Sequence, residues 1–204
     1  MDNKQFMRMM DDLFGTEPSR NIFRLEPERK EALKARIALW NGLVWVFIHP
    51  LYNARSFYDI EEGLSRLVCM PSETVPPIII FEEREYVKFL SLWLKHENRD
   101  TDFHCSMVET DLNDSTPFGY GEECRAYGWK TVTDKFKELG IRRILMGGGW
   151  LEIMKNPDWT GKPPYMEQCV GIALSHLSNK KGGEFEVELS SLIAPPEACT
   201  CFAP

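Results

Sequence analysis

The sequence predicts an α/β domain with an open, mostly parallel, three-layer sheet of about five strands and crossover helices. Short runs of β-branched and aromatic residues alternate along the chain with segments of helical period. The first four runs are apolar enough for burial, which is typical of parallel strands covered on both faces. The strand–helix units are too few for a closed barrel, which needs eight. An open sheet is therefore expected.

The order of elements predicts parallel pairing, since strands joined by crossover helices pair by right-handed connections. This arrangement is Rossmann-like. The last strand alternates apolar and acidic residues, which places it at an edge or leaves it half exposed. The predicted strands are 43–48, 77–81, 103–108, 142–146 and 184–189.

Apolar residues at helical spacing predict the helices, and glycine or proline marks several of their ends. Pro27 suits a first helical turn, and Gly42 and Gly140 each follow a predicted helix. We expect an N-terminal helix and linker over residues 1–25 and one α/β domain over 26–204. The predicted helices are 4–14, 27–40, about 60–68, about 86–94, 122–139 and 165–177.

The composition narrows the classes of function. A formal net charge of −7 works against broad nucleic-acid binding, which usually begins with a basic face. The apolar stretches are far shorter than the roughly 20 residues that span a bilayer. The N-terminal segment lacks the apolar core of a secretory signal, so we expect a cytoplasmic protein. The six cysteines form no CxxC pair, and neither a metal nor a cofactor is predicted.

Ligands of open α/β sheets bind outside the carboxyl ends of the strands, near the point where strand order reverses. Polar and glycine residues follow the predicted strands at this edge, and they define the candidate site for a small-molecule ligand. The predicted catalytic residues are His49, Glu109 and Cys169. The predicted ligand-binding residues are Asn53, Arg55, Gly147, Gly148, Gly149 and Trp150.

Each candidate has a functional and a structural interpretation, and the sequence leaves both open. The glycines after the fourth strand are able to cradle an anion, or to form a tight exit into a loop. His49 is a general base, an orienting residue or a structural histidine, with extended backbone expected before Pro50. Glu82 and Glu83 join Glu109 around a cation, or they begin a helix.

Cys169 lies in the first turns of a predicted helix, where the helix dipole lowers the pKa of a thiol, although a buried cysteine is the commoner role. The runs KELGIRRILMGGG, MEQCVGIALSHL and FEVELSSLIAP resemble the C-terminal half of isochorismatase-like cysteine hydrolases. The resemblance implies amide hydrolysis with Cys169 as nucleophile. The family's aspartate is absent from LVWVFIHP, and its lysine is absent after FHCSMVETD.

Two functions follow as expectations. The first is binding of a small polar metabolite at the carboxyl edge of the sheet, with hydrolysis as its catalytic form. The alternative is a non-catalytic binding or protein-interaction domain with a degenerate active site, in which loop aromatics such as Trp150 and Trp159 serve as anchors. A homo-oligomer is compatible with both. The sequence alone does not decide whether the protein is an enzyme.

Overall fold

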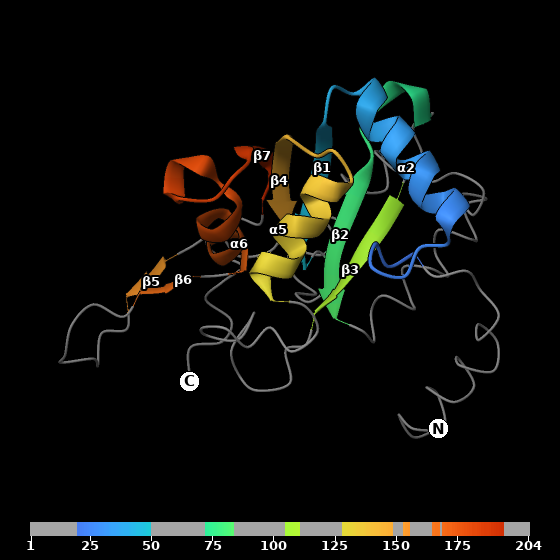
Figure 1. The fold of residues 1–204 in the computed structure, drawn as a ribbon. Coiled ribbons are helices and arrows are strands. Elements are labelled where there is room, and N and C mark those ends of the chain that lie inside the picture. Colours follow the sequence, from blue (N-terminus) through green and yellow to red (C-terminus); the bar gives the residue numbers. More distant parts are fainter. Residues whose placement is uncertain are drawn as a thin grey trace, which may run out of the picture.

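The protein is organised around a five-stranded parallel sheet, which confirms the predicted α/β open sheet (Figure 1). The computed structural model describes residues 20–49, 72–83, 105–110, 128–148, 153–155, 165–167 and 169–193. The strand order is β3-β2-β1-β4-β7. These strands are β1 (Leu43–Ile48), β2 (Ile78–Glu83), β3 (Cys105–Thr110), β4 (Arg143–Gly148) and β7 (Glu186–Ile193).

The strands extend beyond their apolar runs. The sequence locates β1 at its observed bounds, but β2, β3 and β4 each continue two residues further than predicted. Glu82 pairs with Glu109 in the ladder between β2 and β3, and Glu83 pairs with Thr110. The prediction that Glu82 and Glu83 begin a helix is therefore wrong, because backbone pairing with β3 continues past the last apolar side chain.

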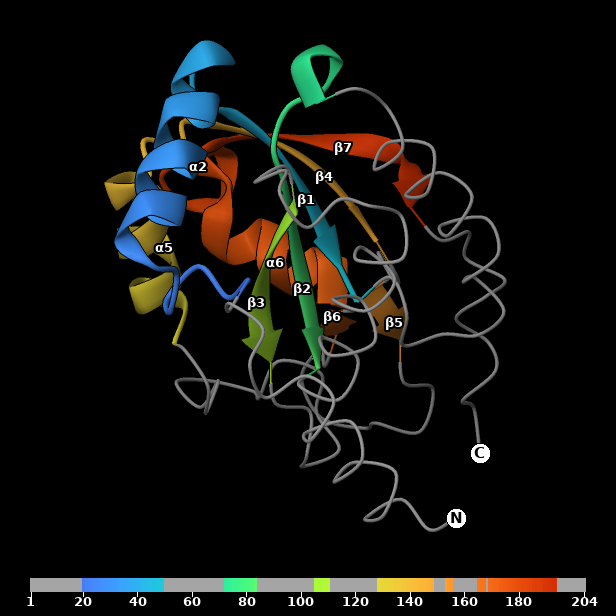
Figure 2. The ribbon, with the colours of Figure 1, turned by 90° about the vertical axis from the view of Figure 1, so that its right-hand side faces the viewer.

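Three helices of at least nine residues lie in the part of the chain that the structure describes, and they pack on one face of the sheet. They are α2 (Pro27–Leu39), α5 (Trp129–Glu138) and α6 (Cys169–Leu177). Figure 2 shows α2 and α5 on the same side of the strands. Residues of all three helices share one apolar core with the strands. This core includes Leu33, Ile37, Val46, Ile48, Phe81, Val132, Phe136, Val170, Ala173 and Leu177.

The opposite face of the sheet is buried as well. Phe47, Ile80 and Met107 alternate with the strand residues of the core, and each has no exposed surface. Burial on both faces is what the continuous apolar runs predicted. The predicted helices at about 60–68 and 86–94, and the one at 4–14, lie outside the described residues.

The connection from β4 to α6 contains a small antiparallel pair, β5 (Ile153–Lys155) and β6 (Tyr165–Glu167). The sequence predicted that a helix begins at residue 165, but α6 begins at Cys169. The prediction is wrong because pairing with β5 holds Tyr165–Glu167 as a strand, and a distant partner of this kind leaves no local signal.

The first described residues belong to the domain, although the sequence predicted a linker there. Ile22 is only 1% exposed and lies in the core. Its N–H donates to the carbonyl oxygen of Met107 at 2.9 Å, and the Met107 N–H donates to that of Arg20 at 2.9 Å. These two hydrogen bonds form an isolated parallel bridge between Asn21 and Met107. Residues 20–22 thus pair with β3, and only the tertiary contact identifies them.

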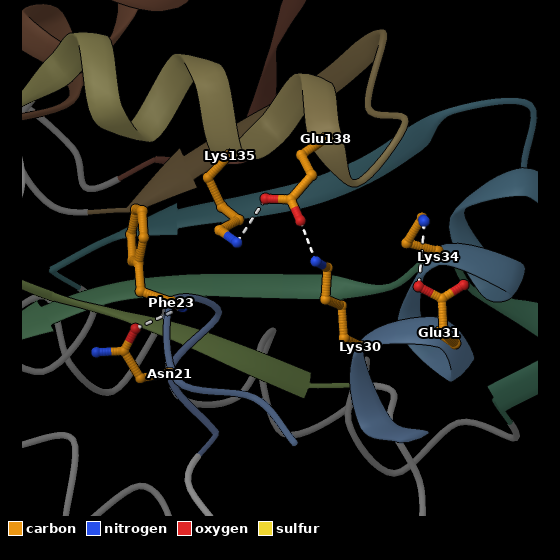
Figure 3. Close-up of polar contacts among 7 residues, drawn as sticks. All are labelled: Asn21, Phe23, Lys30, Glu31, Lys34, Lys135 and Glu138. Atoms are coloured by element: carbon orange, nitrogen blue, oxygen red, sulfur yellow. Dashed lines mark hydrogen bonds and ion pairs between the residues drawn. The ribbon is translucent and has the colours of Figure 1, made fainter. Parts of the chain in front are cut away.

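A network of charges joins α2 to α5 (Figure 3). The Glu138 carboxylate forms ion pairs with Lys30 of α2 and with Lys135 of its own helix, the latter at 2.6 Å. Hydrogen bonds from Lys135 and Lys30 lower the pKa of Glu138 from 4.5 to about 2. The side chain is 40% exposed, so solvent screens much of this interaction.

We expect Glu138→Gln to lower the free energy of unfolding by no more than about 1 kcal/mol, because exposed ion pairs contribute little. A carboxylate with a lowered pKa stabilises the protein above about pH 4.5, and that contribution disappears as the pH falls toward 2. Urea unfolding at pH 7 and pH 3 measures the difference. Glu31→Gln is the control, since the Glu31 carboxylate pairs with Lys34 of the same helix. A loss that is equal at both pH values would contradict the expectation.

Candidate functional site

The strand order reverses between β1 and β4. From β1 the chain proceeds through β2 to β3 on one side, and then returns to β4 and β7 on the other side. At such a reversal the connections leave the carboxyl ends of two neighbouring strands in opposite directions, and ligands of open α/β sheets bind in the resulting crevice. The carboxyl ends of β1 and β4 are therefore the reference point for every predicted site residue.

His49 directly follows β1 at this point, and its side chain is fully buried. Its N–H donates to the carbonyl oxygen of Phe81 at 2.8 Å, so the ladder reaches this residue. Its φ is 45°, whereas the sequence predicted extended backbone before Pro50. That prediction is wrong because the backbone bends at His49, although its N–H is still hydrogen-bonded to the carbonyl oxygen of Phe81. A non-glycine residue in this region costs about 1–3 kcal/mol, and such residues cluster at functional sites.

Burial also determines the protonation state of His49. Desolvation lowers the pKa of the imidazole from 6.5 to about 3, because the low-dielectric surroundings disfavour the charged ring. The side chain is therefore neutral near pH 7. A neutral imidazole presents one hydrogen-bond donor and one acceptor, which suits an orienting role better than proton uptake near neutral pH.

Glu82 lies in β2 next to this end of β1, and it too is fully buried. Ile48 pairs with Phe81, so Glu82 is at the level of the sheet where His49 leaves β1. The sequence names Glu82 but omits it from the predicted catalytic set. Its place in the strand follows from pairing with Glu109 of β3, which local sequence does not reveal.

Gly147 and Gly148 belong to β4 itself, whereas the sequence placed them in the segment after the strand. Gly148 pairs with Ile48 and has a φ of 125°. A Cβ at this position would lie 2.1 Å from the carbonyl oxygen of Ile48. The ladder from β4 to β7 also shifts register between Met146 and Gly148. The glycine is thus required by the close approach of β1, and this accounts for it without a bound anion.

Strand spacing limits which candidates one small ligand can contact. Neighbouring strands are about 5 Å apart, so Gly148 of β4 and Glu82 of β2 each lie roughly one spacing from the end of β1. Glu109 of β3 lies one strand further out, about 10 Å from the end of β1 and about 15 Å from Gly148. The ladder therefore groups His49 with Glu82 and Gly148 and leaves Glu109 at the margin.

Cys169 is the first residue of α6, which agrees with its predicted position near a helix start. The described cysteine Cys105 is different, since burial raises the pKa of its thiol to about 12 and makes it unreactive. His176 lies in α6 and its ring stacks on Trp129 at 5.0 Å between centroids. The remaining predicted residues lie outside the described part of the chain: Asn53, Arg55, Gly149 and Trp150.

Among the described residues, no three His, Cys, Asp or Glu side chains gather closely enough to hold a metal ion. No helix in the described ranges is long and apolar enough to cross a membrane. Comparison with known proteins found no matching family model, no matching curated protein and no matching solved structure.

Proposed function

We propose that this protein binds a small polar metabolite at the carboxyl edge of the sheet, beside the reversal of strand order between β1 and β4. The observation that carries the proposal is His49, a buried polar residue with a φ of 45° at the end of β1. A strained polar residue at this position is costly for stability alone, and it is common where a fold orients a ligand. Glu82 at the end of β2 adds a second buried polar group.

In this proposal His49 orients the ligand and does not transfer a proton. Its imidazole is neutral at pH 7, since its pKa is about 3, and a neutral ring is able to donate and accept one hydrogen bond each. The acidic net charge of −7 and the buried Glu82 carboxyl favour a ligand with hydrogen-bond donors over a polyphosphate.

A panel of small polar metabolites tests the proposal by thermal shift, followed by calorimetric titration of each compound that raises the melting temperature. We expect His49→Asn to weaken binding of such a compound by about ten-fold or more, because the shorter amide does not reach the position of Nε2 and one hydrogen bond to the ligand is lost. His176→Asn is the matched control, because this histidine lies in the last turn of α6. Equal affinities in both variants would contradict a site at His49.

A catalytic form of the same proposal is cysteine-dependent hydrolysis. It is supported by Cys169 at the first position of α6, where the positive end of the helix dipole favours the thiolate. Alkylation with iodoacetamide across a pH series, read by mass spectrometry, tests it. We expect Cys169 to react below the usual thiol pKa, with Cys105 as the unreactive internal control. A Cys169 labelling profile centred near pH 8.5, the ordinary thiol pKa, would remove the nucleophile from the proposal.

A further inference from the structure

The turn between α2 and β1, residues 40–42, contains the one Asn–Gly pair of the sequence. Asparagine followed by glycine is prone to lose its side-chain amide, because glycine carries no side chain to hinder attack by its own backbone nitrogen. Asn41 is exposed to solvent, and its φ of 54° is a conformation that asparagine tolerates. This turn, the α2–β1 turn, is therefore a candidate site of covalent modification.

The reaction needs no reagent other than water. The backbone nitrogen of Gly42 attacks Cγ of Asn41, so that a Cγ–N bond closes a succinimide ring and the Cγ–Nδ2 bond breaks. The amide nitrogen leaves as ammonia and takes up the proton that the Gly42 nitrogen loses. Water then opens the ring. Attack at Cγ gives aspartate, whereas attack at the main-chain carbonyl carbon gives isoaspartate, in which the backbone runs through Cβ and Cγ.

The folded turn opposes the first step of this reaction. The Gly42 N–H, which must lose its proton, donates to the Ile37 carbonyl oxygen at 2.9 Å, and Gly42 is buried. The Asn41 N–H donates to the Ala38 carbonyl oxygen at 3.0 Å, so both residues of the pair are bonded to the last turn of α2. The attacking nitrogen becomes available only when these bonds open.

The same turn holds the starts of two neighbouring strands together. The Gly42 carbonyl oxygen accepts from the N–H groups of Arg142 and Arg143, at 2.9 and 3.1 Å. Leu43, the next residue, pairs with Arg143 where β1 and β4 begin. An isoaspartate at position 41 would insert an extra backbone atom before Gly42 and move its carbonyl group away from these donors. Aspartate would leave the backbone unchanged.

We propose that Asn41 is a deamidation site that the folded α2–β1 turn protects and whose isoaspartate product no longer fits that turn. The protein is modified there only while the Gly42 N–H is released from Ile37. The extent of modification then records how long the turn has been open. A chain that has been unfolded for long is marked at the junction of β1 with β4, because its isoaspartate form does not restore the hydrogen bonds of the Gly42 carbonyl group.

Two samples of the full-length protein test the protection, one folded and one unfolded in guanidinium chloride at the same mildly alkaline pH. Peptide mapping by mass spectrometry measures the replacement of the side-chain amide by a carboxyl group at each asparagine. We expect Asn41 to deamidate at least about ten-fold faster in the unfolded sample, because a buried, hydrogen-bonded N–H is exposed in the folded protein only by opening of the turn. Asn179 is the matched control, since it is exposed but is followed by Lys180, whose side chain hinders the attack.

Equal rates at Asn41 in the two samples would overturn the proposal, because the turn would then give no protection. A rate at Asn41 no faster than that at Asn179 in the unfolded sample would overturn it as well, since the Asn–Gly pair would then have no special reactivity.

The Asn41→Asp variant tests the effect of the product. Refolded protein that carries isoaspartate at position 41 should unfold at a lower guanidinium concentration than Asn41→Asp, whose backbone is unaltered and whose aspartate tolerates a positive φ. Circular dichroism measures both transitions. Equal midpoints would show that the turn accommodates the extra backbone atom, and would overturn the proposed mark at the junction of β1 with β4.

Discussion

Replacing Gly148 by alanine is expected to destabilise the protein by about 4 kcal/mol or more, which is exceptional for one added methyl group. The new Cβ would lie 2.1 Å from the Ile48 carbonyl oxygen and 2.5 Å from the Ile48 nitrogen. Both atoms belong to the backbone of a central strand, so neither can move away without breaking the hydrogen bonds between β1 and β4. The φ of 125° adds strain for any residue with a side chain. Urea unfolding followed by circular dichroism measures the loss.

Gly140→Ala is the matched control for this experiment. Gly140 also has a positive φ, 83°, but nothing lies within 4 Å of a Cβ built there. Its substitution therefore measures backbone strain alone, about 1–2 kcal/mol. The difference between the two variants then reports the steric contact of β4 with β1, together with the less tolerated φ at Gly148. Equal destabilisation of both variants would contradict the close approach at Ile48.

Acid is expected to destabilise the protein through His49. The folded state keeps this imidazole neutral down to about pH 3, whereas the unfolded chain binds a proton near pH 6.5. The unfolded state therefore holds more protons between these values, and stability falls as the pH decreases through this window. The slope for one proton is about 1.4 kcal/mol per pH unit, and the whole window amounts to a loss on the order of 5 kcal/mol.

Chemical unfolding at several pH values between 6.5 and 4.5 isolates this effect, because the lowered pKa of Glu138 acts only below about pH 4.5. His49→Asn is the decisive variant, since asparagine does not titrate and tolerates a positive φ. We expect the slope of its unfolding free energy against pH to be smaller than that of the wild type by the contribution of one proton. An unchanged slope would mean that His49 is accessible to protons in the folded state.

The fold class was predictable because its signals are local. Apolar runs and helical periods are properties of neighbouring residues, and they placed β1 at its observed bounds and α2 within one residue of them. The ends of β2 and the start of α6 were not predictable in this way. Glu82 continues a strand because β3 pairs with it, and Tyr165 is held in a strand by β5. Both depend on a pairing partner outside the run of residues itself.

Only part of the candidate site's geometry was predictable from the sequence. The rule that ligands bind at the carboxyl ends of parallel strands singled out His49, and the structure brings Glu82 and Gly148 to the same end of the sheet. The sequence left His49 as a general base, an orienting residue or a structural histidine, and it predicted extended backbone there. Complete burial and a φ of 45° change its expected role to a neutral orienting residue.

By itself, then, the sequence determined the α/β class and the succession along the chain of the five strands of the main sheet, because periodicity can be read from adjacent residues. Only the tertiary structure decided that Gly148 serves the contact with Ile48, that His49 is buried, and that residues 20–22 pair with β3. These properties depend on register, close approach and desolvation. Each arises between segments that are distant in the chain, where sequence patterns carry no information.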